Sequence, residues 1–228
     1  MIDHRVLVQA RMSSNRFPGK MLAKLDGRPL IAHVLSRVQD SCSSGRAVLL
    51  TSDDSTDDRL AEYVSESLGF PVFRGDLHNV HNRYRAYLEL DWCDWFVRIS
   101  GDSPLIDPDL IRKMVGLASE EYDLITNVLN RTFPSGQSIE VVNSRSFLGI
   151  PQESLMEDDR EHVTKYFYRS PDSFNILSLV TDDESLCSGR LVVDTPEDLR
   201  SIEDTLAVEP GAGRGYSALA RLDRGCDG

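Results

Sequence analysis

The stretch that decides the fold is RVLVQARMSSNRFPGKML, residues 5–22. Its first half is a short apolar run with β-branched residues, which is typical of a buried strand. Its second half is a loop that carries three fixed cations, Arg11, Arg16 and Lys20, among serines, a proline and a glycine. Small residues let a backbone approach a phosphate closely, and these cations supply charge-assisted hydrogen bonds. The residues alone favour a solvated surface loop and an anion site about equally.

This loop matches neither of two common phosphate-binding turns. A P-loop would need glycine at position 14 and serine or threonine at position 21, where this chain has Ser14 and Met21. The G-x-G-x-x-G pattern of dinucleotide-binding turns is also missing from the loop. An anion site here would therefore be of another kind.

Strand-like and helix-like patterns alternate along the rest of the chain. We expect strands at 5–10, 47–50, 71–74, 95–100, 122–128, 139–142, 175–180 and 191–193. We expect helices at 29–38, 55–68, 77–88, 108–115, 158–169 and 195–206. This order predicts an α/β fold with a mostly parallel sheet and helices on both faces. The same pattern predicts one domain over residues 1–208, followed by a loosely ordered, glycine-rich tail over 209–228.

Charge and composition exclude several classes of protein. The 228 residues include 25 Lys and Arg and 37 Asp and Glu, so the net charge is −12. This field repels polyanions and argues against partners such as nucleic acid or an anionic membrane, whereas a small anion can still bind where cations gather. The four cysteines form no C-x-x-C pair, and no apolar run suits a signal peptide or a bilayer span. We therefore expect a cytoplasmic protein.

One aspartate follows an expected strand without a helix-capping role. In GDSPLIDPDL, residues 101–110, Asp107 precedes a proline and should cap a helix, while Asp109 lies in the first helical turn. Asp102 has no such role, and at this edge of the sheet its carboxylate could hold a divalent metal. The serious alternative is that Asp102, beside a glycine, only forms a turn.

A second aspartate stands in the same relation to a later helix. In LVVDTPEDL, residues 191–199, Thr195 and Asp198 form a capping pair and leave Asp194 outside it. Because the carboxyl ends of parallel strands meet at one edge, Asp102 and Asp194 should lie near the cationic loop. Two carboxylates with phosphate oxygens and water form the usual ligand set of Mg²⁺. The cationic loop, Asp102 and Asp194 therefore favour one metal–triphosphate site over three unrelated features.

Two further segments carry weaker signals. TSDD, residues 51–54, follows an expected strand and could contact a base or ribose, although turn formation is the commoner reason for such residues. REHV, residues 160–163, places a cation, an acid and an imidazole on successive helix positions, so they cannot all face one ligand.

The motifs taken together are similar to those of a known family. QARMSSNRFPGKML, TSDD, PVFRGD, VRISGDSPLIDP, REHVTKY and VDTPEDL, in this order between residues 6 and 199, resemble the SpsF-type spore-coat polysaccharide cytidylyltransferases. That family is related to the CMP-Kdo and acylneuraminate cytidylyltransferases. The resemblance implies a Rossmann-like, GT-A-like nucleotidyltransferase fold, dependence on Mg²⁺, and transfer of CMP from CTP with release of pyrophosphate.

The resemblance also implies roles for individual residues. Arg11, Arg16 and Lys20 match the family's triphosphate-binding loop. Together with the patterns above, this leads us to expect nucleotide-binding residues at Ala10, Arg11, Ser13, Arg16, Lys20, Ser52, Asp53 and Ser100, with Lys20, Arg11 and Asp102 as catalytic groups. Asp102 and Asp194 match the metal-binding aspartates, and Glu140, Arg160 and His162 would bind the acceptor. The implied acceptor is a small anionic molecule such as a sugar acid or a phosphonate, used in surface polysaccharide or glycoconjugate biosynthesis, and a homodimer is left open.

One segment departs from the family. PSGQSIE, residues 134–140, has Ser135 and Ser138 where the family often has acids, which leaves the acceptor open. Cytosine specificity and the identity of a general base are also open. Two rival hypotheses stand beside this one: a sugar-nucleotide-dependent glycosyltransferase with the same sheet architecture, and a non-catalytic nucleotide-binding module.

Overall fold

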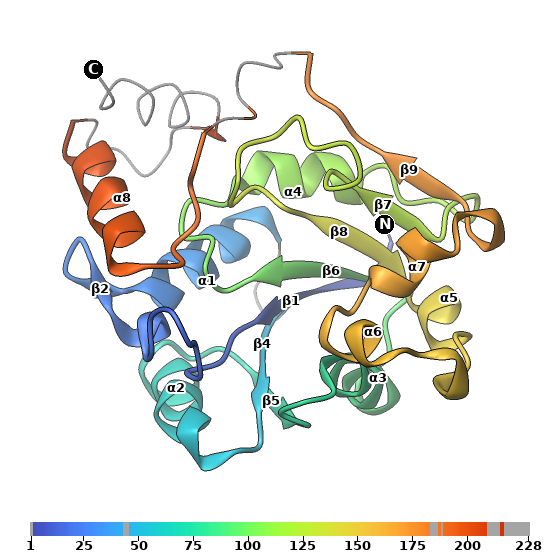
Figure 1. Cartoon of the computed structure of the whole chain (residues 1–228), viewed down its shortest axis with the longest axis horizontal. Helices are drawn as coiled ribbons and strands as arrows, with labels where there is room; N and C mark the ends of the chain where they lie inside the picture. The colour runs from blue at the N-terminus through green and yellow to red at the C-terminus, as the bar shows by residue number, and fades with distance from the viewer. Residues whose placement is uncertain (1, 43–45, 183–186, 188, 209–214, 217–228) are drawn as a thin grey trace.

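A computed structural model describes residues 2–42, 46–182, 187, 189–208 and 215–216. Its main sheet contains the strands β1 His4–Gln9, β4 Ala47–Ser52, β5 Val72–Gly75, β6 Trp95–Ser100, β7 Leu124–Thr126, β8 Glu140–Asn143 and β9 Ile176–Ser178. Their order is β5-β4-β1-β6-β8-β7-β9, and β8 runs antiparallel to both of its neighbours while the other pairs are parallel (Figure 1). The prediction of a mostly parallel sheet is confirmed. A small antiparallel pair, β2 Lys24–Leu25 and β3 Arg28–Pro29, lies apart from it.

Helices cover both faces of the main sheet. They are α1 Leu30–Ser41, α2 Asp58–Glu62, α3 Val80–Leu90, α4 Pro108–Val115, α5 Ser144–Leu148, α6 Glu157–Glu161, α7 Lys165–Arg169 and α8 Pro196–Val208. Short 3-10 turns are at Lys20–Leu22, Ser55–Asp57, Gln152–Ser154 and Pro171–Ser173, and a π-helical turn is at Tyr63–Ser67. None of the helices in the described part of the chain is long and apolar enough to cross a membrane.

Strand β1 shows why the sheet is buried on both sides. Val6 and Val8 belong to the core that includes side chains of α1, α2, α4 and α8. Leu7, which points to the other face, belongs to the core formed with α3, α5 and α7. All three are fully buried. A continuous apolar run is what a central strand with two covered faces requires, and the short run at residues 5–10 predicted it.

The two predicted helix caps are confirmed. The Asp107 carboxylate accepts hydrogen bonds from the backbone N–H groups of Asp109 at 2.8 Å and Leu110 at 3.4 Å. Thr195 and Asp198 exchange side-chain and backbone hydrogen bonds at 2.8 and 3.2 Å, which is a capping box. Both caps can be read from a few neighbouring residues because all their partners are local.

Three expected elements differ from the structure. Residues 191–193 do not form a strand. The backbone there makes isolated contacts with two loops: Arg190 forms a single bridge with Ser135, and Val193 N–H donates to Asp102 O at 2.9 Å. The expected helix at 158–169 is two short helices, α6 and α7, separated by extended backbone at His162. The expected helix at 55–68 is a 3-10 turn, the short helix α2 and a π-helical turn in succession. The Asp54 side chain caps the first of these by accepting from Thr56 N–H at 2.9 Å.

The predicted tail at 209–228 lies outside the described residues except for Gly215 and Tyr216. Tyr216 N–H donates to the second oxygen of Asp107 at 3.0 Å, and its ring packs on Phe133 with 5.4 Å between the centroids. The helices and strands that the structure describes all lie between His4 and Val208.

A buried histidine should make the fold sensitive to acid. The side chain of His81 on α3 is fully buried against Phe147, and neither ring nitrogen has a hydrogen-bond partner among the described residues. Burial lowers the pKa of His81 to about 4, helped by Arg85 and opposed by Asp159. The unfolded chain binds this proton near pH 6.5, so stability should fall as the pH drops from 6.5 toward 4, by roughly 3 kcal/mol.

The test replaces the ring by an apolar side chain of similar size. Urea unfolding at pH 7 and pH 4.5 should show that His81→Leu loses less stability between the two pH values than the parent does. An equal loss in both proteins would show that His81 does not carry this acid sensitivity.

Candidate active site

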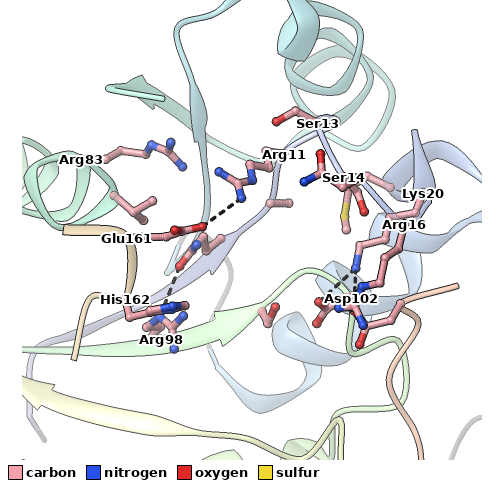
Figure 2. Close-up of a pocket in the computed structure, with 17 residues that line it drawn as sticks. Arg11, Ser13, Ser14, Arg16, Lys20, Arg83, Arg98, Asp102, Glu161 and His162 are labelled. Carbon is pink, nitrogen blue, oxygen red and sulfur yellow. Dashed lines mark hydrogen bonds and ion pairs between the residues drawn. The ribbon is translucent and has the colours of Figure 1, made fainter. Parts of the chain in front are cut away.

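A pocket of about 430 Å³ opens at the carboxyl ends of β1 and β6 (Figure 2). The loop after β1, the first turns of α3, the end of α6 and Asp194 form its walls. The charged side chains in its lining are the cations Arg11, Arg16, Lys20, Arg83 and Arg98 and the acids Asp102, Glu161 and Asp194. Five cations in one pocket of a chain with a net charge of −12 make a local attraction for anions.

The loop after β1 is folded on itself by its own backbone. Met12 O accepts hydrogen bonds from Ser14 N–H and Gly19 N–H, both at 3.0 Å. Gly19 has φ +75°, a left-handed conformation that favours glycine. The loop thus returns to its start just before Lys20, and both ends of the loop face the same pocket.

The turn after β6 packs directly on the end of β1. Gly101 N–H donates to Gln9 O at 2.8 Å, and a Cβ at Gly101 would lie 2.7 Å from the Cβ of Ala10. No larger residue fits without moving a strand, which explains why a glycine precedes Asp102. This close approach brings the Asp102 carboxylate to the cationic loop.

The Lys20 ammonium lies between two carboxylates. Its Nζ is 3.2 Å from Asp102 Oδ2, 3.4 Å from Asp194 Oδ1 and 2.8 Å from Val193 O. An ammonium has three protons, so these contacts use all of its donors. The Lys20 side chain is only 8% exposed. In this structure Lys20 contacts the two aspartates, and its predicted contact with phosphate stays a prediction.

This carboxylate pair suits a divalent cation. Asp102 and Asp194 converge on one positive group, and the Val193 N–H bond to Asp102 O fixes the two segments relative to each other. Both side chains are about one fifth exposed, so their oxygens reach the pocket. No group of three or more metal-ligating side chains occurs among the described residues. The remaining ligands of a cation such as Mg²⁺ would therefore come from water and from a bound substrate, as is common for this ion.

Asp194 is surrounded by positive charge. Arg16 lies 3.0 Å and Arg190 3.3 Å from its carboxylate, in addition to Lys20. Arg190 also pairs with Asp198 at 2.7 Å, and this hydrogen bond holds the pKa of Asp198 well below its usual range. The capping acid of α8 thus helps to place an arginine beside Asp194.

The opposite wall carries a buried arginine without a carboxylate partner among the described residues. Arg83 on α3 is 1% exposed, and its guanidinium donates to Asp76 O at 2.6 and 3.1 Å. Burial lowers the pKa of Arg83. Arg11 pairs with Glu161 at 3.3 Å across the pocket, and both of these side chains are largely exposed (Figure 2). An exposed pair of this kind is weak, so Arg11 can leave it for a ligand at small cost.

Glu140 supports the pocket from below its surface. Its buried carboxylate accepts hydrogen bonds from Arg98 at 2.6 Å, Thr164 at 2.6 Å and Tyr168 at 2.5 Å. Glu140 does not line the pocket, whereas Arg98 does. The residue predicted to bind the acceptor directly is therefore placed where it orients an arginine that faces the pocket.

The structure brings most of the predicted site residues together. Ala10, Arg11, Ser13, Arg16, Lys20, Ser100, Asp102, His162 and Asp194 all line the pocket. Ser52, Asp53 and Arg160 do not: Ser52 is buried against Asp57, Asp53 N–H binds Gly75 O, and Arg160 is exposed.

Sequence reasoning missed Arg83, Arg98 and Glu161 in the lining. Arg98 stands inside a buried apolar strand, which is a signal that could have found it. Glu161 was set aside because neighbours on a helix face different ways, but α6 ends at Glu161 and lets both Glu161 and His162 line the pocket. We find no sequence signal for Arg83.

The chain is similar to known proteins over almost its whole length. Residues 5–210 match the family model described as cytidylyltransferase. The spore coat polysaccharide biosynthesis protein SpsF of Bacillus subtilis is 33% identical over 209 residues, 89% of this chain and 86% of that protein. The 8-amino-3,8-dideoxy-manno-octulosonate cytidylyltransferase of Shewanella frigidimarina is 32% identical over 72% of this chain and 64% of that protein.

A solved structure shares the same architecture. The structure of a cytidylyltransferase from Leptospira borgpetersenii superposes with a TM-score of 0.92 and 26% identity, covering 100% of this chain and 96% of that one. The nucleotidyltransferase fold predicted from the motifs is thereby confirmed.

Proposed function

The chain belongs to the cytidylyltransferase family, and we propose that it transfers CMP from CTP to a sugar acid with release of pyrophosphate. The observation that carries the proposal is the meeting of a cationic loop and a carboxylate pair in one pocket. An acceptor oxygen forms a bond to the α-phosphorus as the bond between that phosphorus and the bridging oxygen of pyrophosphate breaks. The acceptor proton leaves to solvent, and pyrophosphate carries the released charge.

Asp102 and Asp194 would hold a divalent cation, which we propose to be Mg²⁺. When bound, this cation would offset the charge of the triphosphate and polarise the phosphate that is attacked. Two carboxylates and no third protein ligand among the described residues fit an ion that is completed by phosphate oxygens and water.

The residues of the loop would position the triphosphate and neutralise its charge. Arg16 and Arg11 have largely exposed side chains at the pocket mouth and exchange weak ion pairs for phosphate oxygens. The serine-rich backbone between them, with Ser13 in the pocket lining, allows a close approach. Little covalent chemistry falls to the protein in such a transfer, so alignment and charge neutralisation supply most of the rate.

The acceptor would lie toward His162 and Arg98, away from Lys20 (Figure 2). A sugar acid brings a carboxylate, and Arg98, which Glu140 holds in place, offers a cation on this side of the pocket. Ser135 and Ser138, which replace family acids, do not line the pocket. The segment around them binds residues 189–191, since Ser135 N–H donates to Gly189 O at 2.9 Å and Ser135 O accepts from Leu191 N–H at 2.8 Å.

The rival glycosyltransferase hypothesis is not favoured by the structure of this chain. Residues 107–109 have the D-x-D spacing that glycosyltransferases often use for metal binding. Here Asp107 caps α4 and Asp109 is exposed outside the pocket lining. Polysaccharide or glycoconjugate biosynthesis in the cytoplasm, where CTP is available, is the setting that we propose.

The experiment that tests the proposal measures pyrophosphate. The protein is incubated with each nucleoside triphosphate, Mg²⁺ and a panel of sugar acids, sugar phosphates and phosphonates. We expect pyrophosphate only with CTP and a sugar acid. Release with another nucleotide, or no release with any acceptor, would contradict the proposal.

A further inference from the structure

A fully buried aspartate, Asp57, lies outside the lining of the pocket. The side chain of Asp57 is fully buried, and no lysine or arginine forms an ion pair with it among the described residues. It lies in the short 3-10 turn between β4 and α2. A buried charge is costly unless hydrogen bonds compensate for it, so the partners of this carboxylate have to be accounted for.

Four donors from two different segments satisfy the carboxylate. Thr51 Oγ1–H donates at 3.0 Å, Ser52 N–H at 3.1 Å, and the Ser52 hydroxyl also donates. The fourth donor is Met12 N–H, at 2.6 Å, from a segment 45 residues earlier in the chain. A carboxylate is the side chain that can accept four such bonds without donating any, whereas an asparagine has one oxygen and two donor protons.

The hydrogen bond from Met12 N–H connects Asp57 to the loop after β1, whereas the other three bonds connect it to β4. Thr51 and Ser52 belong to β4, six and five positions before Asp57, and their bonds stabilise the end of that strand. Met12 lies between Arg11 and Ser13, two pocket residues (Figure 2). Its carbonyl accepts from Ser14 N–H and Gly19 N–H, each at 3.0 Å. Asp57 therefore fixes the residue on which both halves of the cationic loop converge.

The carboxylate also acts on the far wall of the pocket. Burial lowers the pKa of Arg83, and the charge of Asp57 opposes part of this effect. A neutral residue at position 57 would remove this support from a guanidinium that is itself buried.

We propose that Asp57 is a positioning residue for the phosphate-binding loop: it holds the loop in its binding conformation before the nucleotide arrives. The inference rests on the proposed function in that the loop is taken to bind a triphosphate. Fixing a loop in advance removes an ordering cost from binding, so the benefit should be seen in nucleotide affinity. A purely structural Asp57 would affect stability and leave the affinity of the folded protein unchanged.

The first test compares Asp57→Asn with Asp58→Asn. Asp58 is the adjacent aspartate, but its side chain is exposed and pairs only with Arg74, at 2.7 Å, among the described residues. Asp57→Asn leaves at least one of the two backbone N–H groups without an acceptor and should weaken CTP binding about tenfold, measured by calorimetry well below the melting temperature. Asp58→Asn should bind CTP as the parent does. CTP affinity within twofold of the parent in Asp57→Asn would overturn the proposal.

The second test needs no activity, and its first part uses only the parent protein. Amide hydrogen exchange in the nucleotide-free parent should show Met12 N–H protected to a degree similar to Val8 N–H in β1. If Asp57→Asn folds, protection at Met12 and Gly19 should fall at least tenfold while that at Val8 is kept. Met12 N–H exchanging as fast as exposed loop amides in the parent would refute the proposal. A parent that is protected at Met12 but does not bind CTP would instead count against the proposed function.

Discussion

Replacing Asp102 by asparagine is expected to reduce metal-dependent pyrophosphate release at least a hundredfold, about 2.7 kcal/mol, while the protein remains folded. The amide keeps the shape of the side chain but removes the charge that a divalent cation needs. The melting temperature should stay within a few degrees of the parent, because the lost attraction to Lys20 is offset by relief of repulsion from Asp194. Asp194→Asn should lose activity to a similar extent. The measurements are a pyrophosphate assay over a range of Mg²⁺ concentrations and thermal melts.

The matched control is an aspartate five positions from Asp102 in the sequence. Asp107 caps α4 and lies outside the pocket lining. Asp107→Ala should therefore keep most of the activity and lose about 1 kcal/mol of stability. The proposed metal site would be wrong if Asp102→Asn and Asp194→Asn kept activity near that of the parent.

Lys20→Ala should weaken CTP binding at least tenfold, about 1.4 kcal/mol. It should also destabilise the fold, because the three hydrogen bonds of a nearly buried ammonium are lost and two carboxylates are left facing each other. Calorimetry with CTP and thermal melts measure the two effects.

The control for this variant is Lys24→Ala, since Lys24 is exposed and lies outside the pocket lining. A further measurement uses the divalent metal alone. Mg²⁺ without nucleotide should raise the melting temperature of Lys20→Ala more than that of the parent, because the metal would replace the missing positive charge. Unchanged CTP affinity in Lys20→Ala would remove the phosphate role from this lysine.

The parts of the fold and site that the sequence predicted depend on local patterns. The caps at Asp107 and Thr195 need only residues within one helical turn. The strand β1 follows from a short apolar run, and the place of Asp102 beside the loop follows from its position just after β6, at the carboxyl edge of the sheet. Asp194 also reaches the loop, but residues 191–193 before it do not form a strand. These inferences required no knowledge of which side chains touch across the molecule.

The parts that were not predicted depend on contacts between distant residues. Residues 191–193 have the composition of a strand, but their backbone binds Ser135 and Asp102 in loops. Glu140 is a polar residue at a strand start, and only the positions of Arg98, Thr164 and Tyr168 show that it is buried. The role of Asp57 depends in the same way on a bond to Met12, 45 residues away.

The placement of Lys20 has a consequence for how the pocket fills. Its three protons are all in use, so a phosphate can reach the ammonium only by exchange for an existing partner. Asp102 and Asp194 would hold a divalent ion bound together with the nucleotide, and Lys20 would then be free to donate to phosphate oxygens. The two carboxylates would then face a positive charge in both states, first the lysine and later the ion. Lys20 thus supplies the positive charge that Asp102 and Asp194 need as long as no divalent ion is bound.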